Sequence, residues 1–327
     1  MTRSFVPMEF RPATALPDGD WQFEPKWDGF RCIVARQGSA VRLTSKRGQS
    51  LGRYFPEVVE QCEKIAAKRF TLDGEIVIRK RGATFDDLLQ RIHPAASRVA
   101  ALAKSTPAVL QIFDLLSAPE AGDIAREPLS QRRSRLEAFA RKYFPNNKTL
   151  LLSPATRSRA VANRWLTKPD PAAEGVVAKF ADEAYQPGTR DGGFKVKVLR
   201  TADCVVGGFR YSSAGGAVGS LLLGLYDADG KLNHVGFTSG FSDEERRKLL
   251  PMLKRLIKPP GFTGSKPGGP SRWATARTSE WEPLAPKLVV EVAFDRVTSG
   301  RIRHGARFVR WRTDKAPRRC TDDQLTD

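Results

Sequence analysis

The residues with the clearest capacity for chemistry lie in one run, Glu24-Pro25-Lys26-Trp27-Asp28-Gly29-Phe30-Arg31. A lysine amine attacks an electrophile only when it is neutral, and nearby cations or removal from water favour that form. The run combines this candidate nucleophile with a carboxylate that could orient it, a glycine for a tight turn and an arginine fork for phosphate. A strand that ends in a solvated Asp-Gly hairpin turn would contain the same residues. The run alone leaves both interpretations open.

Further charged or aromatic residues follow near the ends of other apolar segments. They are Arg47, Asp73-Gly74-Glu75, Phe113, Glu174, Lys195, Lys197, Arg312 and Lys315. Each has an ordinary structural explanation, because Asp-Gly is common in turns, alternating lysines suit a solvated strand face and a phenylalanine suits a core. As a set and in this order, they are more informative than any one of them alone.

Hydrophobic alternation predicts strands around most of these residues in the first two hundred positions. The predicted strands are three short pieces within 21–47, followed by 70–78, 108–116, 174–179 and 194–198. Helical spacing predicts helices over 56–67, 85–92, 99–104, 129–144 and 157–166. The candidate residues therefore lie on or beside strands, with helices on the flanks.

After about residue 200 the pattern changes to strands with little helix. Strands are predicted at 204–211, 219–226, 232–237, 288–294 and 307–312, and one helix at 243–257. That helix has an acidic first turn and basic last turns, as the helix dipole favours. Several strands and one helix on a basic segment of this length suit a small Greek-key barrel that binds nucleic acid.

Composition limits the class of protein. The chain has 327 residues, of which 40% are hydrophobic, so two domains are the natural expectation. The net charge of +19, basic both before and after residue 200, indicates a polyanionic partner such as nucleic acid. A protein that is basic only for solubility is the alternative. No apolar run approaches the ~20 residues of a membrane helix and no signal peptide begins the chain, so we expect a cytoplasmic protein.

The four cysteines and three histidines are isolated from one another in the sequence. Neither a Cys-x-x-Cys pair nor a zinc-type spacing is present. We therefore expect buried free thiols, and any metal ion should be a hard cation held by carboxylates and phosphate.

Together and in this order, these residues resemble the nucleotidyltransferase motifs of the superfamily of ATP-dependent DNA ligases and mRNA capping enzymes. The resemblance extends from about Trp21 to Lys315 and is closest to the ligase domain of bacterial non-homologous end-joining ligases and to their stand-alone relatives. Segments typical of that branch are the run around Lys26, Glu174-Gly175-Val176-Val177-Ala178-Lys179, Lys195-Val196-Lys197 and Gly219-Ser220-Leu221-Leu222-Leu223-Gly224. Phe194 departs from it, because a tryptophan often stands there, but an aromatic residue is retained.

The resemblance implies an α+β fold in two domains. Residues 1–199 would form a nucleotidyltransferase (adenylation) domain of antiparallel sheets with flanking helices. Residues 200–327 would form a small β-barrel, an OB-fold domain. A hinge near Leu199-Arg200-Thr201 would allow the second domain to move during the reaction.

The resemblance also implies the chemistry of Lys26. This residue would attack the α-phosphate of ATP, forming a lysyl-AMP phosphoramidate and releasing pyrophosphate. Lys195 and Lys197, with a bound Mg²⁺ or Mn²⁺, would favour the neutral amine and neutralise charge on the α-phosphate. Asp28 would orient the lysine or the metal. Two further carboxylates, Glu75 and Glu174, would serve the ribose hydroxyl and the metal shell.

The remaining candidates would hold the nucleotide and the nick. Phe113 would stack on adenine, while Glu24 and the backbone at Pro25 would read its edge. Arg31 and Arg47 would contact the ribose and the 5′-phosphate of the nick, where a bidentate fork is valuable.

Arg312 and Lys315, in the second domain, would orient pyrophosphate in the first step. AMP would then move to the 5′-phosphate, and the 3′-hydroxyl of the nick would displace it.

The expected partner is nicked double-stranded DNA. Only 25 residues precede Lys26, too few for the helical DNA-binding domain of larger ligases, so a minimal two-domain monomer is expected. It would act on nucleoid DNA in the cytoplasm, away from membranes, with help from end-joining proteins. The alternatives are an RNA ligase, a GTP-using capping-type enzyme, or a non-catalytic DNA-binding protein on the same scaffold.

Overall fold

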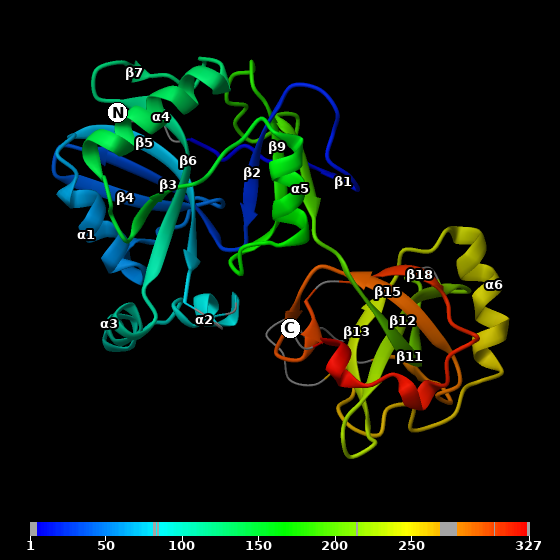
Figure 1. Ribbon diagram of the computed structural model, residues 1–327. Helices are drawn as coiled ribbons and strands as arrows, with labels where there is room; N and C mark the ends of the chain where they lie inside the picture. Colours follow the sequence, from blue (N-terminus) through cyan, green and yellow to red (C-terminus); the bar gives the residue numbers. More distant parts are fainter. Residues whose placement is uncertain are drawn as a thin grey trace. The chain divides into compact units, whose positions relative to one another are not determined.

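The computed structural model describes residues 5–80, 83, 85–213, 215–268, 280–303 and 305–325. The chain divides into two compact units, Met1–Val198 and Leu199–Asp327, each of which is considered by itself (Figure 1). All four cysteines are buried free thiols, as expected. None of the described helices is long and apolar enough to cross a membrane.

The first unit contains a six-stranded sheet with the order β4-β3-β5-β6-β7, and β8 pairs with β6. Its strands are β3 (Phe30–Gln37), β4 (Ala40–Ser45), β5 (Arg69–Ile78), β6 (Ala108–Ala118), β7 (Gly122–Asp123) and β8 (Leu150–Leu152). One face packs under α1 (Pro56–Lys64) and α4 (Leu129–Tyr143), where Leu72, Ile76 and Leu110 are buried with Val58 and Leu136. Because strand side chains alternate, Asp73, Glu75 and Val77 project from the other face.

The second sheet of this unit has the order β1-β10-β9-β2. Its strands are β1 (Arg11–Ala13), β2 (Trp21–Trp27), β9 (Ala173–Phe180) and β10 (Gly193–Lys197). One face packs under α5 (Arg159–Thr167), where Phe23, Val176 and Val196 are buried with Ala162. The other face packs toward the six-stranded sheet, since Trp27 and Ala173 share a cluster with Val77 and Phe113.

The helices of this unit differ from the predictions mainly at their ends. The two short predicted helices are α2 (Phe85–Gln90) and α3 (Ala96–Ser105). Helix α5 begins two residues later than predicted, because the Ser158 side chain accepts a hydrogen bond from the Val161 amide and so caps the first turn. Strand β1 was not predicted, since three residues around a proline carry too little alternation.

The strand that carries Lys26 does not continue into a hairpin. Strand β2 pairs with β9, whereas β3 pairs with β4 and β5 in the other sheet. The hairpin interpretation of Asp28-Gly29 is therefore wrong. A tight turn is therefore not the reason for glycine at position 29. A Cβ at this position would lie 2.0 Å from the carbonyl oxygen of Ile76. The chain passes close to β5 here, and only glycine fits.

The second unit is a curled sheet with the order β13-β12-β11-β15-β18, and β14 pairs with β11. Its strands are β11 (Arg200–Tyr211), β12 (Val218–Tyr226), β13 (Leu232–Thr238), β14 (Glu282–Pro283), β15 (Val289–Phe294) and β18 (Arg307–Trp311), with a small hairpin of β16 (Val297–Thr298) and β17 (Arg301–Ile302). A bridge between Thr238 and Ala306 joins the two outer strands, so the sheet closes into a barrel.

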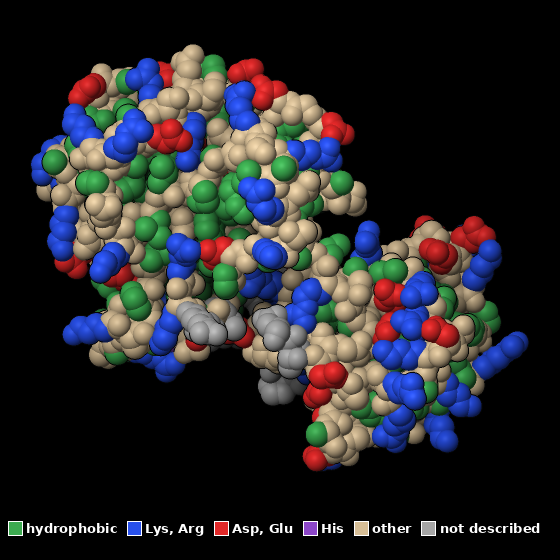
Figure 2. All heavy atoms as spheres, in the orientation of Figure 1, with side chains coloured by type: hydrophobic (Ala, Val, Ile, Leu, Met, Phe, Trp, Pro, Cys, Tyr) green, Lys and Arg blue, Asp and Glu red, His purple; other side chains and the backbone are tan. Residues whose placement is uncertain are grey.

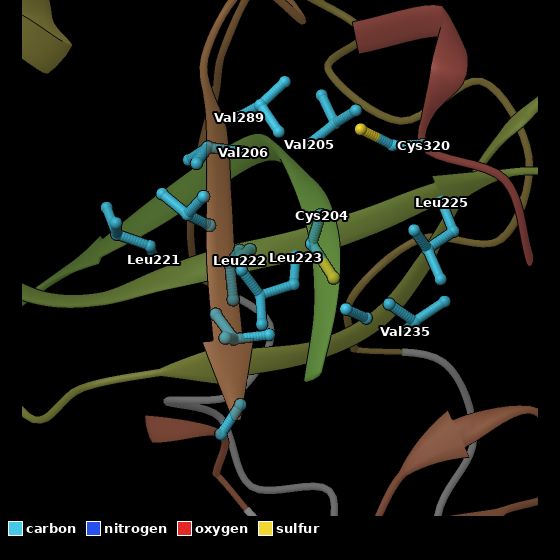
Figure 3. Packing of buried hydrophobic residues seen from close by; sticks show 14 of the residues in the cluster. Cys204, Val205, Val206, Leu221, Leu222, Leu223, Leu225, Val235, Val289 and Cys320 are labelled. Carbon is cyan, nitrogen blue, oxygen red and sulfur yellow. The ribbon is translucent and has the colours of Figure 1, made fainter. Parts of the chain in front are cut away.

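The barrel is filled by aliphatic and aromatic side chains and by thiols. Figure 3 shows Leu223, Leu225, Val235 and Cys204 gathered between the strands, and all are buried. Helix α6 (Asp243–Lys254) packs on the outside and begins with a capping box between Ser242 and Glu245.

Candidate active site

Lys26 lies on β2 with its amine paired to the carboxylate of Glu174. Lys197 of β10 pairs with the same carboxylate at 3.0 Å. The Lys26 side chain is 22% exposed, so it is accessible while most of it is enclosed. Burial opposes ionisation of Glu174, but the charges of Lys26 and Lys197 outweigh it and lower the pKa of this carboxyl. The candidate nucleophile is therefore held by a carboxylate that stays ionised.

A third lysine adds positive charge to this pair. Burial lowers the pKa of Lys195, and the nearby charges of Lys26 and Lys197 lower it further. Lys195 and Lys197 project from the same face of β10 because they are two residues apart on a strand. Lys26 and Lys197 thus share one carboxylate, Glu174, with the charge of Lys195 nearby, and this concentration of positive charge suits an anionic ligand such as phosphate.

A β-bulge places Glu174 beside Lys26. In the pairing of β2 with β9, Lys26 lies opposite Gly175 and Trp27 lies opposite Ala173, which leaves Glu174 as the extra residue. A bulge of this kind re-aims a side chain and is frequent next to active sites.

A cavity of about 70 Å³ lies beside Lys26 and has Glu24, Pro25, Phe113 and Val177 among its lining residues. The guanidinium of Arg31 lies 4.5 Å from the centre of the Phe113 ring. The Lys179 amine lies 4.6 Å from the same ring centre. A planar base that stacked on Phe113 would share the ring with these cations.

The edge of this cavity is a buried ion pair that sequence reasoning did not find. Lys179 lies 2.7 Å from Glu24, and both side chains are 3% exposed. The Gln22 amide donates a hydrogen bond of 2.7 Å to the other carboxylate oxygen of Glu24. Lys179 is two residues after Val177 on β9, so strand alternation could have assigned it to the pocket.

Phe10 also lines the cavity and comes from the segment before the first predicted strand. It is buried in a cluster with Met8, Val177 and Tyr185. No charge pattern marks it, so the sequence carried no signal for its position. The N-terminal segment therefore contributes a wall of the candidate nucleotide pocket.

Arg31 is fixed by a carboxylate on the neighbouring strand. Its guanidinium donates to both oxygens of Asp73 at 2.6 and 2.7 Å. The Tyr185 hydroxyl donates to Asp73 at 2.6 Å and accepts a hydrogen bond from the Met8 amide. This network explains why Asp73, as well as Glu75, belongs to the site: it orients the arginine fork toward the cavity.

Glu75 lies on the same face of β5 as Asp73 and has a raised pKa. Burial raises its pKa to about 7, although the positive charges of Arg31 and Lys26 act in the opposite direction. The negative charges of Asp73 and Asp28 raise it further. The Glu75 carboxyl can therefore gain or lose a proton near neutral pH.

The three candidates for outer phosphate contacts lie elsewhere. Arg47 follows β4 and is exposed. Its neighbour Lys46 pairs with Glu9 at 2.9 Å. Arg312 and Lys315 belong to the second unit, where both pair with Asp203 at 2.8 Å. Within the first unit the structure thus gathers the predicted residues, Arg47 apart, around Lys26. Within the second unit it gathers Arg312 and Lys315 around Asp203.

Comparison with known proteins identifies the family. The sequence pattern described as "ATP dependent DNA ligase domain" matches residues 12–197, and that described as "ATP dependent DNA ligase C terminal region" matches residues 214–315. DNA ligase C of Mycobacterium tuberculosis is 42% identical over 335 residues, covering 98% of this chain and 93% of that protein. The multifunctional non-homologous end joining protein LigD of Mycolicibacterium smegmatis is 29% identical, covering 91% of this chain and 36% of that protein.

A solved structure agrees with this assignment. The ligase domain of LigD from M. tuberculosis has a TM-score of 0.51 and 27% identity, covering 97% of this chain and 98% of that one. The expected fold, a nucleotidyltransferase domain followed by an OB-fold domain, is confirmed. The chain belongs to the family of ATP-dependent DNA ligases.

Proposed function

We propose that Lys26 carries AMP from ATP to the 5′-phosphate of a nick in double-stranded DNA. The neutral amine would attack the α-phosphorus, the bond to the pyrophosphate oxygen would break, and a phosphoramidate would form after loss of a proton. AMP would pass to the 5′-phosphate, and the 3′-hydroxyl would then displace AMP. The observation that carries the proposal is the pairing of both Lys26 and Lys197 with Glu174, with the charge of Lys195 close to these two lysines.

Within this proposal each neighbour of Lys26 has a task. Lys195 and Lys197 would neutralise charge that grows on the α-phosphate, since fixed cations stabilise it without reorganisation. Glu174 would orient the Lys26 amine before attack. Glu75 would accept a hydrogen bond from the ribose, which is stronger when the carboxyl is ionised, and its raised pKa makes this contact sensitive to pH.

The base and the nick would be held by the residues around the cavity. Phe113 would stack on adenine, with Glu24 and the backbone at Pro25 at its edge. Arg31, oriented by Asp73, would contact the ribose. The exposed Arg47 would bind the 5′-phosphate of the nick.

Arg312 and Lys315 would bind the pyrophosphate portion of ATP during the first step. Support comes from their shared cluster in the second unit and from the family to which the chain belongs.

A divalent cation, Mg²⁺ or Mn²⁺, would add positive charge on the phosphates. Asp28, Glu75 and Glu174 are the proposed protein ligands. Among the described residues, no group of three or more His, Cys, Asp or Glu side chains is arranged to hold a metal. The carboxylates fit a site whose other ligands are phosphate oxygens and water, which is the shell that Mg²⁺ commonly accepts.

The nucleophile can be tested with ATP labelled at the α-phosphate. Wild-type protein should acquire a covalent label, whereas Lys26→Ala should acquire none. Lys64→Ala is a matched control, because Lys64 is an exposed lysine that pairs with Glu60 one helical turn away. A label that persists in Lys26→Ala would place the nucleophile elsewhere.

The alternatives within the superfamily are separated by substrate. Labelling by GTP in place of ATP would favour a capping-type enzyme. Faster sealing of nicked RNA than of nicked DNA would favour an RNA ligase. We expect label from ATP and sealing of DNA, because the ligase C relative aligns over nearly the whole chain.

The proposal extends to the setting of the reaction. We infer a monomer that acts on nucleoid DNA in the cytoplasm, with end-joining proteins as partners. Support comes from the net charge of +19, which favours association with DNA, and from the similarity to LigD, a non-homologous end joining protein. Figure 2 shows lysine and arginine side chains on the drawn surface of both units.

A further inference from the structure

One carboxylate in the second unit, Asp203 of β11, joins two of the cations assigned to pyrophosphate. The Arg312 guanidinium donates through Nη1 to both oxygens of Asp203 at 2.8 Å each. The Lys315 amine donates to the same carboxylate at 2.8 Å. The Asp203 side chain is 12% exposed, so this contact lies largely out of solvent. A single acid therefore holds both cations at one place.

The other edge of the Arg312 guanidinium pairs with a second carboxylate, Asp314, which is exposed. Nε and Nη2 of Arg312 donate to Asp314 at 2.9 and 2.8 Å. The Asp314 side chain is 63% exposed, and it lies in the same short turn as the arginine. The pair is bidentate, and the hydrogen bonds from Arg312 lower the pKa of Asp314 to about 2. Because Asp314 is exposed, it can leave the guanidinium when another anion binds the same edge in its place.

Asp203, in contrast, cannot move without disturbing the barrel. Its amide donates to the side-chain oxygen of Gln324 at 2.9 Å, and its carbonyl accepts from the Gln324 side-chain nitrogen at 3.2 Å. On the other side, β11 pairs with β15, where Asp203 lies opposite Glu291. The carboxylate is thus built into the sheet, whereas Asp314 is not.

A hollow lies next to the two cations. It has a volume of about 450 Å³ and is lined by Arg312, Asp314, Lys315, Ala316 and Arg319. Three of these residues are cationic. If an anion displaced Asp314, it would meet the freed edge of Arg312 together with Lys315 and Arg319. A phosphate offers the several oxygens that such a group of donors can bind.

We propose that Asp203 is a positioning residue for the polyphosphate of ATP. It holds Arg312 and Lys315 side by side against their mutual repulsion and leaves the Nε edge of Arg312 to exchange Asp314 for phosphate. Without this carboxylate the two long side chains separate, and the donors no longer converge on one anion. The inference rests on the proposed role of Arg312 and Lys315 in binding pyrophosphate.

The test separates the first step of the reaction from the last. In Asp203→Asn, the rate of labelling by ATP at low ATP concentration should fall about 10- to 100-fold, as expected for loss of hydrogen bonds between charged groups. Sealing of a nick that is already adenylated on its 5′-phosphate should stay within about twofold of wild type. Asp314→Asn should change labelling by less than about threefold, because phosphate takes the place of Asp314 on the same edge of Arg312.

Glu291→Gln is the matched control, since Glu291 lies opposite Asp203 on β15 and pairs with Arg310 instead. It should leave both reactions near wild type. Equal losses of labelling and of sealing in Asp203→Asn would indicate a folding defect and overturn the positioning role. An equal loss in Asp314→Asn would overturn the distinction between the two acids.

The variants Arg312→Ala and Lys315→Ala separate this inference from the function on which it rests. If either slows labelling while Asp203→Asn does not, the pyrophosphate role stands and the positioning role is wrong. If neither slows labelling, the pyrophosphate role fails and the inference fails with it.

Discussion

Replacement of Glu174 by glutamine tests whether orientation of Lys26 or charge around it limits formation of lysyl-AMP. The carboxylate is 7% exposed and pairs with Lys26 and Lys197, which are 22% and 27% exposed. A hydrogen bond between charged groups contributes about 1.5–3 kcal/mol, and partial exposure reduces this to about 1–2 kcal/mol for each lysine. An amide can still accept one hydrogen bond but cannot balance the charge.

The two contributions together amount to about 2–4 kcal/mol, which corresponds to a rate about 30- to 1000-fold lower if both act on the transition state. A second effect opposes this loss, because removal of a negative charge favours the neutral, nucleophilic form of an amine. We expect the loss of orientation to dominate, since an amine without its partner can rotate away from the line of attack.

The assay is the single-turnover rate of covalent labelling by ATP in wild type and Glu174→Gln, at an ATP concentration that saturates both. Glu60→Gln is the matched control, because Glu60 also pairs with a lysine but both side chains are more than half exposed. The control should label at the wild-type rate. Labelling of Glu174→Gln at or above the wild-type rate would refute the reasoning and would mean that Glu174 mainly suppresses the nucleophile.

Three further predictions concern stability and DNA binding. Arg132→Met should lower the free energy of unfolding, measured in urea, by about 3–5 kcal/mol. Arg132 and Asp114 form an ion pair in which each side chain is 1% exposed, so loss of the arginine leaves a buried charge. The control Arg135→Met removes an exposed ion pair with Glu127 and should change the free energy of unfolding by less than about 1 kcal/mol. The pKa of Glu75 is raised to about 7 by burial, so its contribution to stability is present below the pKa of the unfolded chain and is lost as pH rises through about 7. Urea midpoints between about pH 5 and 8 should therefore fall more in wild type than in Glu75→Gln, and equal slopes would contradict this account. The net charge of +19 predicts that binding to a nicked duplex depends on salt. If the protein contacts six or more phosphates, its affinity should fall about 1000-fold between roughly 50 and 200 mM salt. An affinity that does not change with salt would exclude this number of phosphate contacts.

The sequence predicted the participants of the candidate site better than their connections. Lys26, Lys195, Lys197 and Glu75 gather because strand alternation places each on the inner face of its sheet, and alternation is readable from sequence. The partners that hold them were not readable in the same way. Asp203 lies 109 residues before Arg312 in the chain, and only the pairing of β11 with β15 and of β15 with β18 brings the two together.

Two side chains of the site depend on irregularities that alternation alone cannot predict. Val176 and Ala178 lie two and four residues after Glu174 and pack under α5. In a regular strand, the Glu174 side chain would therefore point toward α5 as well, and away from Lys26. Phe113 is likewise the extra residue between Ile112, opposite Gly74, and Asp114, opposite Asp73. After this bulge the buried face of β6 changes from even-numbered to odd-numbered residues, since Leu110 and Ile112 share a core with Leu115. Because each bulge turns one side chain toward the candidate nucleotide pocket, a deletion that restored regular pairing at residue 174 should abolish labelling by ATP while the sheet itself still forms.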